Sequence, residues 1–163
     1  RASRKRRSLK GSSAPASSEP PKRLVVAANP ILSALLNERG AASRIFWRTP
    51  AIEFATTAYT ISEVRKYLPT LAKAIARSQE LLDMSLRLLP LAIHDRRAYR
   101  ARLGDAQRRI GERDPNDVDS LALALQLQAP IWSNDHDFSV ARVPWFTTAR
   151  LLAQLQAGGA SET

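Results

Sequence analysis

The chain has 163 residues, a formal net charge of +10 and no cysteine. This length is enough for one domain with a full hydrophobic core and argues against two. No apolar run reaches the roughly 18 residues that a membrane helix needs, and no apolar segment of a secretory signal follows the basic N-terminus. The lack of cysteine excludes disulfides and thiolate zinc sites and fits a reducing compartment, so we expect a cytoplasmic protein. Because no apolar run is long enough to span a bilayer, we expect no membrane contact.

Most of the positive charge lies in a short N-terminal segment. Residues 1–23 contain eight Lys/Arg and one Glu, whereas the rest of the chain has a net charge of only +3. Residues 1–22 are rich in Ser and Pro and poor in apolar side chains, so we predict a disordered tail there and a disordered end at 158–163, around a domain at 23–157. The basic cluster is either a solvated linker or a contact for nucleic-acid phosphates.

Beyond Lys22, segments with strand character alternate with segments of helix character. We predict strands at 24–28, 54–57, 91–93, 130–133 and 145–147. We predict helices at 31–36, 42–47, from Thr60 onward with a break at Pro69, and at 78–89, 95–111, 115–128 and 148–155. Strands separated by helices indicate a parallel sheet that is covered by helices on both faces.

Two of these helices have recognisable starts. Thr60-Ile61-Ser62-Glu63 matches a capping box, and Asp114-Pro115 places a capping acid before a proline in the first turn. The run L-A-L-A-L-Q-L-Q that follows alternates as a strand would, but it has no β-branched or aromatic residue. Ala and Leu are strong helix formers, so a helix that ends before Pro130 is the better interpretation.

Acidic residues gather at two places that a wound α/β sheet brings together. Asp114, Asp117 and Asp119 lie at the start of a predicted helix, and Asp135 and Asp137 directly follow a predicted strand. The carboxyl ends of strands and the N-termini of helices face the same crevice in such a sheet. Carboxylates gathered there, away from any cysteine, suggest a hard divalent cation and phosphate chemistry.

Each acid also has a purely structural explanation. Glu63 suits the third position of a capping box, and Asp114 suits an N-cap. Asp117 and Asp119 complement the positive end of a helix dipole, and the two acids after the strand fit a turn. Because all of these positions converge on one crevice, the set as a whole favours a metal site or its relic.

Four segments, taken together, resemble the PIN-domain nucleases, whose fold is shared by VapC-type toxin ribonucleases. The segments are R-L-V-V-A-A-N-P-I-L-S-A-L-L, T-I-S-E-V, D-P-N-D-V-D-S-L-A-L-A-L and A-P-I-W-S-N-D-H-D-F. The last two, in that order, are the more specific. The resemblance implies a three-layer α/β/α sandwich with a central parallel sheet of four or five strands.

The resemblance also implies a metal site and its ligands. In the family, acids from separate segments bind Mg²⁺ or Mn²⁺, which activates a water and stabilises charge on the phosphodiester. The matching residues here are Glu63, Asp117 and Asp135 as catalytic and metal-binding acids, Asp137 as a supplementary ligand, and Asn29, Ser33 and Ser133 as polar residues that line the site.

One position departs from the family pattern. The first strand of the family ends in D-x-N, but Ala27 stands where the aspartate belongs, two residues before Asn29. A methyl group cannot bind a cation, so we expect weaker metal binding and weaker water activation. The alternative is a catalytically silent PIN-like module that binds RNA or another protein.

The resemblance further implies RNA as substrate, a cognate antitoxin as partner and a homodimer. The arginines of the predicted helix at 95–111 either follow an RNA backbone or form a solvated face. Those we single out for RNA are Arg96, Arg97, Arg100 and Arg108.

Overall fold

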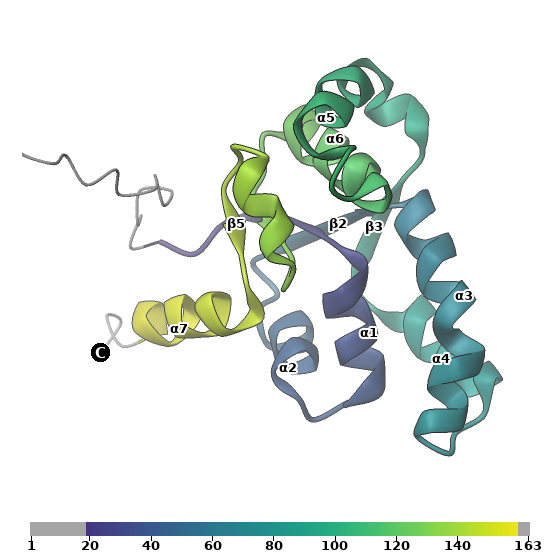
Figure 1. Cartoon of the computed structure of the whole chain (residues 1–163). Helices are drawn as coiled ribbons and strands as arrows, with labels where there is room; N and C mark the ends of the chain where they lie inside the picture. The colour runs from purple at the N-terminus through teal and green to yellow at the C-terminus, as the bar shows by residue number, and fades with distance from the viewer. Residues whose placement is uncertain (1–18, 160–163) are drawn as a thin grey trace, which may run out of the picture.

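The computed structural model describes residues 19–159, in which a parallel sheet is packed between helices (Figure 1). The strands are β1 (Arg23–Val26), β2 (Glu53–Thr57), β3 (Leu91–His94), β4 (Ile131–Trp132) and β5 (Trp145–Phe146). The α-helices are α1 (Ala28–Leu36), α2 (Ala41–Arg48), α3 (Ala58–Ala74), α4 (Gln79–Leu88), α5 (Leu103–Ile110), α6 (Val118–Leu127) and α7 (Thr148–Gly159). Four 3₁₀ turns complete the description: η1 (Arg96–Ala98), η2 (Arg100–Arg102), η3 (Pro115–Asp117) and η4 (His136–Val140).

The sheet has the strand order β3-β2-β1-β4-β5, and all neighbouring strands are parallel. The order reverses between β1 and β4, where Val26 pairs with Trp132. In open α/β sheets such a reversal leaves a crevice at the carboxyl ends of the two central strands. The crevice predicted to hold the acids is therefore located beside the ends of β1 and β4.

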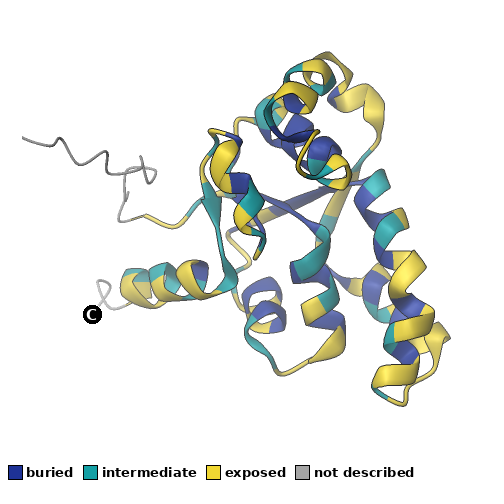
Figure 2. Ribbon diagram, viewed as in Figure 1, coloured by how far each residue is buried: buried dark blue, intermediate teal, exposed yellow. Residues whose placement is uncertain are grey.

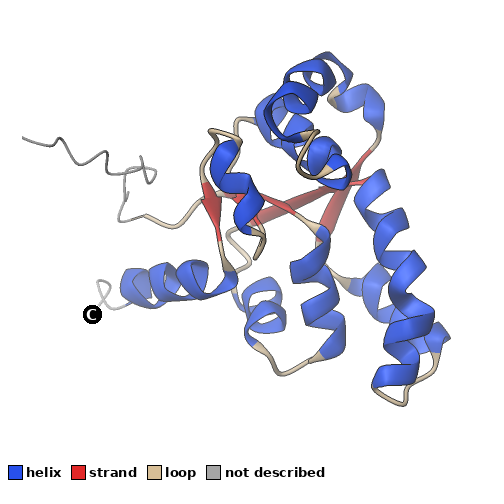
Figure 3. Cartoon of the chain, viewed as in Figure 1, coloured by secondary structure: helices blue, strands red, loops and turns tan. Residues whose placement is uncertain are grey.

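Helices cover both faces of the sheet, which confirms the predicted α/β/α sandwich. The side chains of Leu24 and Val26 join a buried cluster with α1 to α4, whereas Val25 faces the opposite cluster with α5 and α6. Figure 2 shows buried residues along the strands and on the helix faces turned toward them. Figure 3 shows the same strands enclosed between helices. The alternation of Leu24, Val25 and Val26 between the two faces of the sheet is the period-two pattern expected of a strand that is buried on both sides.

The predicted strands are all present, but the helix predicted from Thr60 onward was wrong in two details, its start and its break. Helix α3 begins after Thr57, whose side chain accepts a hydrogen bond from the Thr60 amide, so Thr60 lies inside the helix and is no capping residue. The helix also runs through Pro69 without a break. Pro69 and Arg65, four residues before it, are both exposed, so water can satisfy the carbonyl that proline leaves without a donor.

The long basic helix predicted at 95–111 was also wrong. The segment forms η1 and η2 before α5 begins at Leu103. Asp95 caps the first turn by accepting a hydrogen bond from the Arg97 amide, and Tyr99, with φ of −132°, interrupts the helical backbone. The Tyr99 side chain is buried. The break in the helix therefore turns this aromatic ring toward the core.

The ends of the described chain contact the domain. The carbonyl of Glu19 accepts a hydrogen bond from the Gln154 side chain on α7, and α7 continues to Gly159. The tail predicted at residues 1–22 falls mostly outside the described residues, as does most of the predicted disordered end at 158–163. Between residues 19 and 159, no helix is long and apolar enough to cross a membrane.

Candidate metal centre

A network of polar side chains joins the ends of β1 and β4. The amide of Ala27 donates to the carbonyl of Trp132 at 3.0 Å, and in the first turn of α1 the Asn29 side chain donates to Ser133 Oγ at 3.3 Å. Ser133 Oγ accepts from the Asp135 amide at 3.0 Å. Asn29 and Ser133, both predicted to line the site, thus hold the turn that carries Asp135.

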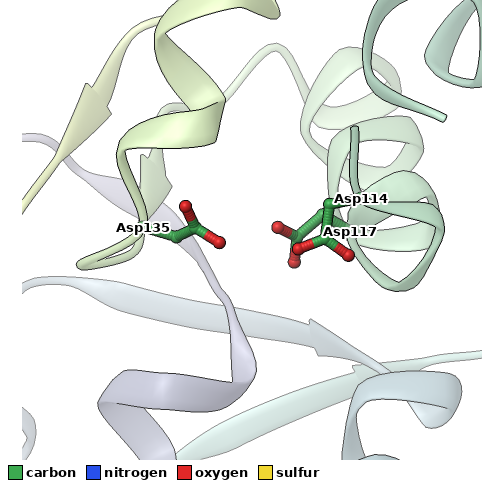
Figure 4. Close-up of side chains that lie close together, drawn as sticks. All are labelled: Asp114, Asp117 and Asp135. Atoms are coloured by element: carbon green, nitrogen blue, oxygen red, sulfur yellow. The ribbon is translucent and has the colours of Figure 1, made fainter. Parts of the chain in front are cut away.

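Three carboxylates face one another across this crevice (Figure 4). One oxygen of each of Asp114, Asp117 and Asp135 lies within 4.8 Å of the others, the only such group of potential metal ligands between residues 19 and 159. Asp114 is the N-cap of η3 and Asp117 is its last residue, and Asp135 approaches from the turn after β4. The sequence prediction that acids from these two segments meet is consistent with this geometry.

The buried oxygen of Asp117 has no partner. Its Oδ2 atom is inaccessible to water and makes no hydrogen bond within the described structure. Burial raises the pKa of Asp117 to about 8, with further contributions from the charge of Asp114, a hydrogen bond to Asp114, and the charges of Asp135 and Asp137. A buried acceptor without a donor is costly, and carboxylates this close repel one another when ionised. A hard divalent cation would both bind the unpaired oxygen and neutralise the repulsion between the carboxylates, so these residues fit a metal ion.

Residue 27 contributes no ligand to the crevice. Ala27 directly follows β1 and precedes α1, and it is 1% exposed. Its side chain packs in the apolar cluster shared with α5 and α6. The carboxylate that the first strand would provide is therefore missing at the centre of the sheet.

The other predicted ligands lie outside the group of three. Glu63 on α3 accepts a hydrogen bond from Lys66 Nζ at 2.8 Å. One turn earlier, the Tyr59 hydroxyl donates to Asn116 Oδ1 in η3 at 2.8 Å, which ties α3 to the turn carrying the acids. Burial, and then the charge of Glu63, raise the pKa of Tyr59, so Glu63 lies within electrostatic reach of that link.

Two further predicted site residues occupy the rim. Asp137 donates its amide to Asp135 Oδ1, and its carboxylate lies 3.8 Å from the Arg113 guanidinium. Ser33 is exposed on α1, one turn beyond Asn29. Neither belongs to the group of three carboxylates.

The arginines predicted for RNA differ in their surroundings. Arg96 donates two hydrogen bonds to the buried carboxylate of Asp119, at 3.0 and 3.1 Å. Arg108 lies 3.8 Å from Asp105, whereas Arg97 and Arg100 are exposed on the 3₁₀ turns. Arg96 is thus committed to Asp119 and Arg108 is paired with Asp105, whereas the exposed Arg97 and Arg100 remain available to a ligand.

Sequence reasoning missed the roles of two acids. Asp114 was counted among the acids at the start of the predicted helix, but the only role given to it by itself was that of a helix cap. Its spacing of three from Asp117 was a signal that both could lie on one side of a turn. Asp119 was assigned to the helix dipole, but it is 2% exposed. Its flanking sequence, V-D-S-L-A-L-A, is buried throughout, so an acid within it needed internal partners.

Comparison with known proteins agrees with this architecture. A family model described as PIN domain matches residues 25–156. A chain in the "Crystal structure of VapBC2 from Rickettsia felis bound to a DNA fragment from their promoter" is similar in structure, with a TM-score of 0.58 at 15% sequence identity. The similarity covers 77% of this chain and 98% of that chain, and at this identity it establishes the fold alone. No curated protein sequence matches the chain.

Proposed function

Because the chain belongs to the PIN-domain family, we propose that it is a metal-dependent endoribonuclease that hydrolyses RNA phosphodiesters in the crevice beside β1 and β4. The observation that carries this proposal is the buried Oδ2 atom of Asp117, which has no hydrogen-bond donor and lies among carboxylates. Most buried polar atoms in proteins have a hydrogen-bond partner. A buried carboxylate oxygen without a donor, among other carboxylates, therefore suits a cation.

The proposed ligands are oxygen donors, which suit Mg²⁺ or Mn²⁺. Asp117 and Asp135 hold the cation, Asn29 and Ser133 orient the turn of Asp135, and Asp137 and Glu63 contribute from the rim. A bound divalent cation lowers the pKa of water and neutralises charge on a phosphodiester. Asp117 must give up its proton before it can serve as a ligand, because its pKa of about 8 keeps it protonated at neutral pH.

The proposed RNA contact lies on the arginine-bearing turns. Arg97, Arg100 and Arg108 present exposed guanidinium groups on the segment that packs against α6. Such groups neutralise backbone phosphates without selecting a sequence. They would therefore contribute affinity for the strand and little preference among bases.

We further propose that the chain acts in the cytoplasm as the toxin component of a toxin–antitoxin pair, with a cognate antitoxin and a second copy of itself as partners. The support for this finer statement is the fold shared with a chain of the Rickettsia felis VapBC2 structure. The test is a pull-down of this chain with the product of a neighbouring gene. We expect the two proteins to co-purify, and we expect the complex to lose the RNA cleavage shown by the free chain.

One observation favours a second function. Ala27 removes a carboxylate from the centre of the crevice, and the resulting site suits a catalytically silent PIN-like module that binds RNA or another protein. Under this alternative the remaining acids would serve as helix caps and turn residues. The two functions differ in whether any phosphodiester is broken.

Cleavage of a labelled RNA in the presence of Mn²⁺ tests the proposal, with the unaltered chain, Ala27→Asp and Asp117→Asn compared side by side. We expect slow, metal-dependent cleavage by the unaltered chain, faster cleavage by Ala27→Asp, and none by Asp117→Asn. Retained RNA binding without cleavage by the first two proteins would establish the silent module instead.

A further inference from the structure

We infer that Asp114 supplies the metal-binding carboxylate that the first strand lacks, so that the start of the α6 segment provides two ligands and β1 provides none. This inference rests on the proposed function, because it names a residue of the same metal centre. It reassigns Asp114, which sequence reasoning treats as a helix cap, to direct contact with the cation.

The backbone of η3 places the two acids on the same side of the turn. A 3₁₀ turn has three residues per turn, so side chains three positions apart are eclipsed. Asp114 and Asp117 are three apart, and the Asp117 amide donates to the Asp114 carbonyl at 3.2 Å, the hydrogen bond that defines such a turn. The D-P-N-D sequence therefore directs both carboxylates toward Asp135.

Asp114 is held in place before any cation binds. Its amide donates to the carbonyl of Ile110 at 2.9 Å, and its Oδ1 atom accepts from the Asn116 amide at 3.0 Å. Both bonds fix the backbone and one carboxylate oxygen, and the side chain is only partly buried. A ligand whose position is already determined loses little conformational entropy on binding.

The carboxylate count supports the reassignment. The crevice lacks the acid at position 27, and the Glu63 carboxylate is engaged by Lys66. With Asp114 included, three carboxylates still converge within 4.8 Å. The cation would then be displaced from the end of β1 toward the start of α6, which is compatible with the apolar surroundings of Ala27.

The test measures Mn²⁺ affinity of the full chain by calorimetry, without any activity readout. Asp114→Asn removes the charge and keeps the cap, because asparagine is an equally good N-cap. We expect its Mn²⁺ affinity to fall by about tenfold or more, since even indirect partners of a metal cost that much when altered. Asp114→Ser, a second uncharged cap, should show the same loss.

Asp95→Asn is the matched control. Asp95 also caps a 3₁₀ turn, accepting from the amide two residues on, and it lies outside the group of three carboxylates. Its Mn²⁺ affinity should equal that of the unaltered chain. Equal binding by the unaltered chain and both Asp114 variants would overturn the inference and leave the proposed function standing. Failure of the unaltered chain to bind Mn²⁺ would overturn both.

Discussion

Asp117 and Asp119 lie two residues apart at the start of α6, and their surroundings are opposite in character. Asp119 faces η1 and η2, where Arg96 donates two hydrogen bonds and the Tyr99 hydroxyl donates a third at 2.6 Å. Asp117 faces β4, where its buried Oδ2 atom has no donor and its neighbours Asp114 and Asp135 are acids. The two acids therefore differ in whether their buried oxygens have hydrogen-bond partners. We interpret Asp119, whose partners are complete, as a structural acid, and we propose Asp117 as a metal ligand.

The largest expected effect is the loss of cleavage on Asp117→Asn. Removing a ligand at the centre of the site should reduce the Mn²⁺-dependent cleavage rate by about 100-fold or more, beyond the cost of altering an indirect metal partner. Urea unfolding of the metal-free variant at neutral pH should show little loss of stability, because asparagine is close in size to the protonated, uncharged carboxyl group that it replaces. Cleavage at the unaltered rate would end the functional assignment of Asp117.

Asp119→Ala should instead act on stability. The buried Tyr99 hydroxyl loses its acceptor, and an unsatisfied buried polar group costs about 1–3 kcal/mol of unfolding free energy. The Arg96 side chain is 61% exposed, so water replaces its lost partner. Arg97→Ala, on the same turn and exposed, is the control and should leave the urea midpoint nearly unchanged. Equal midpoints for Asp119→Ala and the unaltered chain would contradict the structural role of Asp119.

The metal-free protein should lose stability as the pH rises. The folded chain holds a proton on Asp117 up to a pKa of about 8, whereas the unfolded chain releases it near the usual value of 3.8. The folded state therefore binds more protons across this window, and the unfolding free energy falls from pH 4 to pH 8. Urea unfolding in chelator should show this slope, and Asp117→Asn should have a shallower one. Parallel slopes for the two proteins would mean that the Asp117 carboxyl is not buried as described.

The smallest effect is expected for Glu63→Gln. Glu63 is paired with the exposed Lys66 and lies outside the group of three carboxylates, so we expect a decrease in cleavage of no more than a few-fold. Lys66→Gln provides the control, since it releases Glu63 while keeping its charge. A loss as large as that of Asp117→Asn would place Glu63 among the direct metal ligands.

Much of the fold could be predicted because local signals agreed with it. The apolar strand at Leu24 to Val26 and the proline at position 115 each determine an element with little help from the rest of the chain. The segment at 95–111 could not be predicted, because its helix is interrupted by a contact between Tyr99 and Asp119, twenty residues away. Long-range contacts of this kind leave no periodic pattern in the sequence.

The location of the candidate site could be predicted from the sequence, but the set of residues that form it could not. The convergence of Asp117 and Asp135 follows from the parallel sheet and its point of reversal. The inclusion of Asp114 depends on a 3₁₀ turn where an α-helix was predicted. The position of Glu63 depends on Thr57, which starts α3 three residues earlier than the expected capping box.

The most direct test of the contrast between Asp117 and Asp119 is the shift in melting temperature that Mn²⁺ produces in the unaltered chain, Asp117→Asn and Asp119→Asn. A ligand at about 100 times its Kd stabilises by about 2.7 kcal/mol, which corresponds to roughly 5–10 °C for a protein of this size. We predict this shift for the unaltered chain and for Asp119→Asn, although the latter melts at a lower temperature without metal. Asp117→Asn should show little shift. An equal shift in Asp117→Asn, or loss of the shift in Asp119→Asn alone, would contradict the proposal that Asp117 binds the metal and that Asp119 is a structural acid.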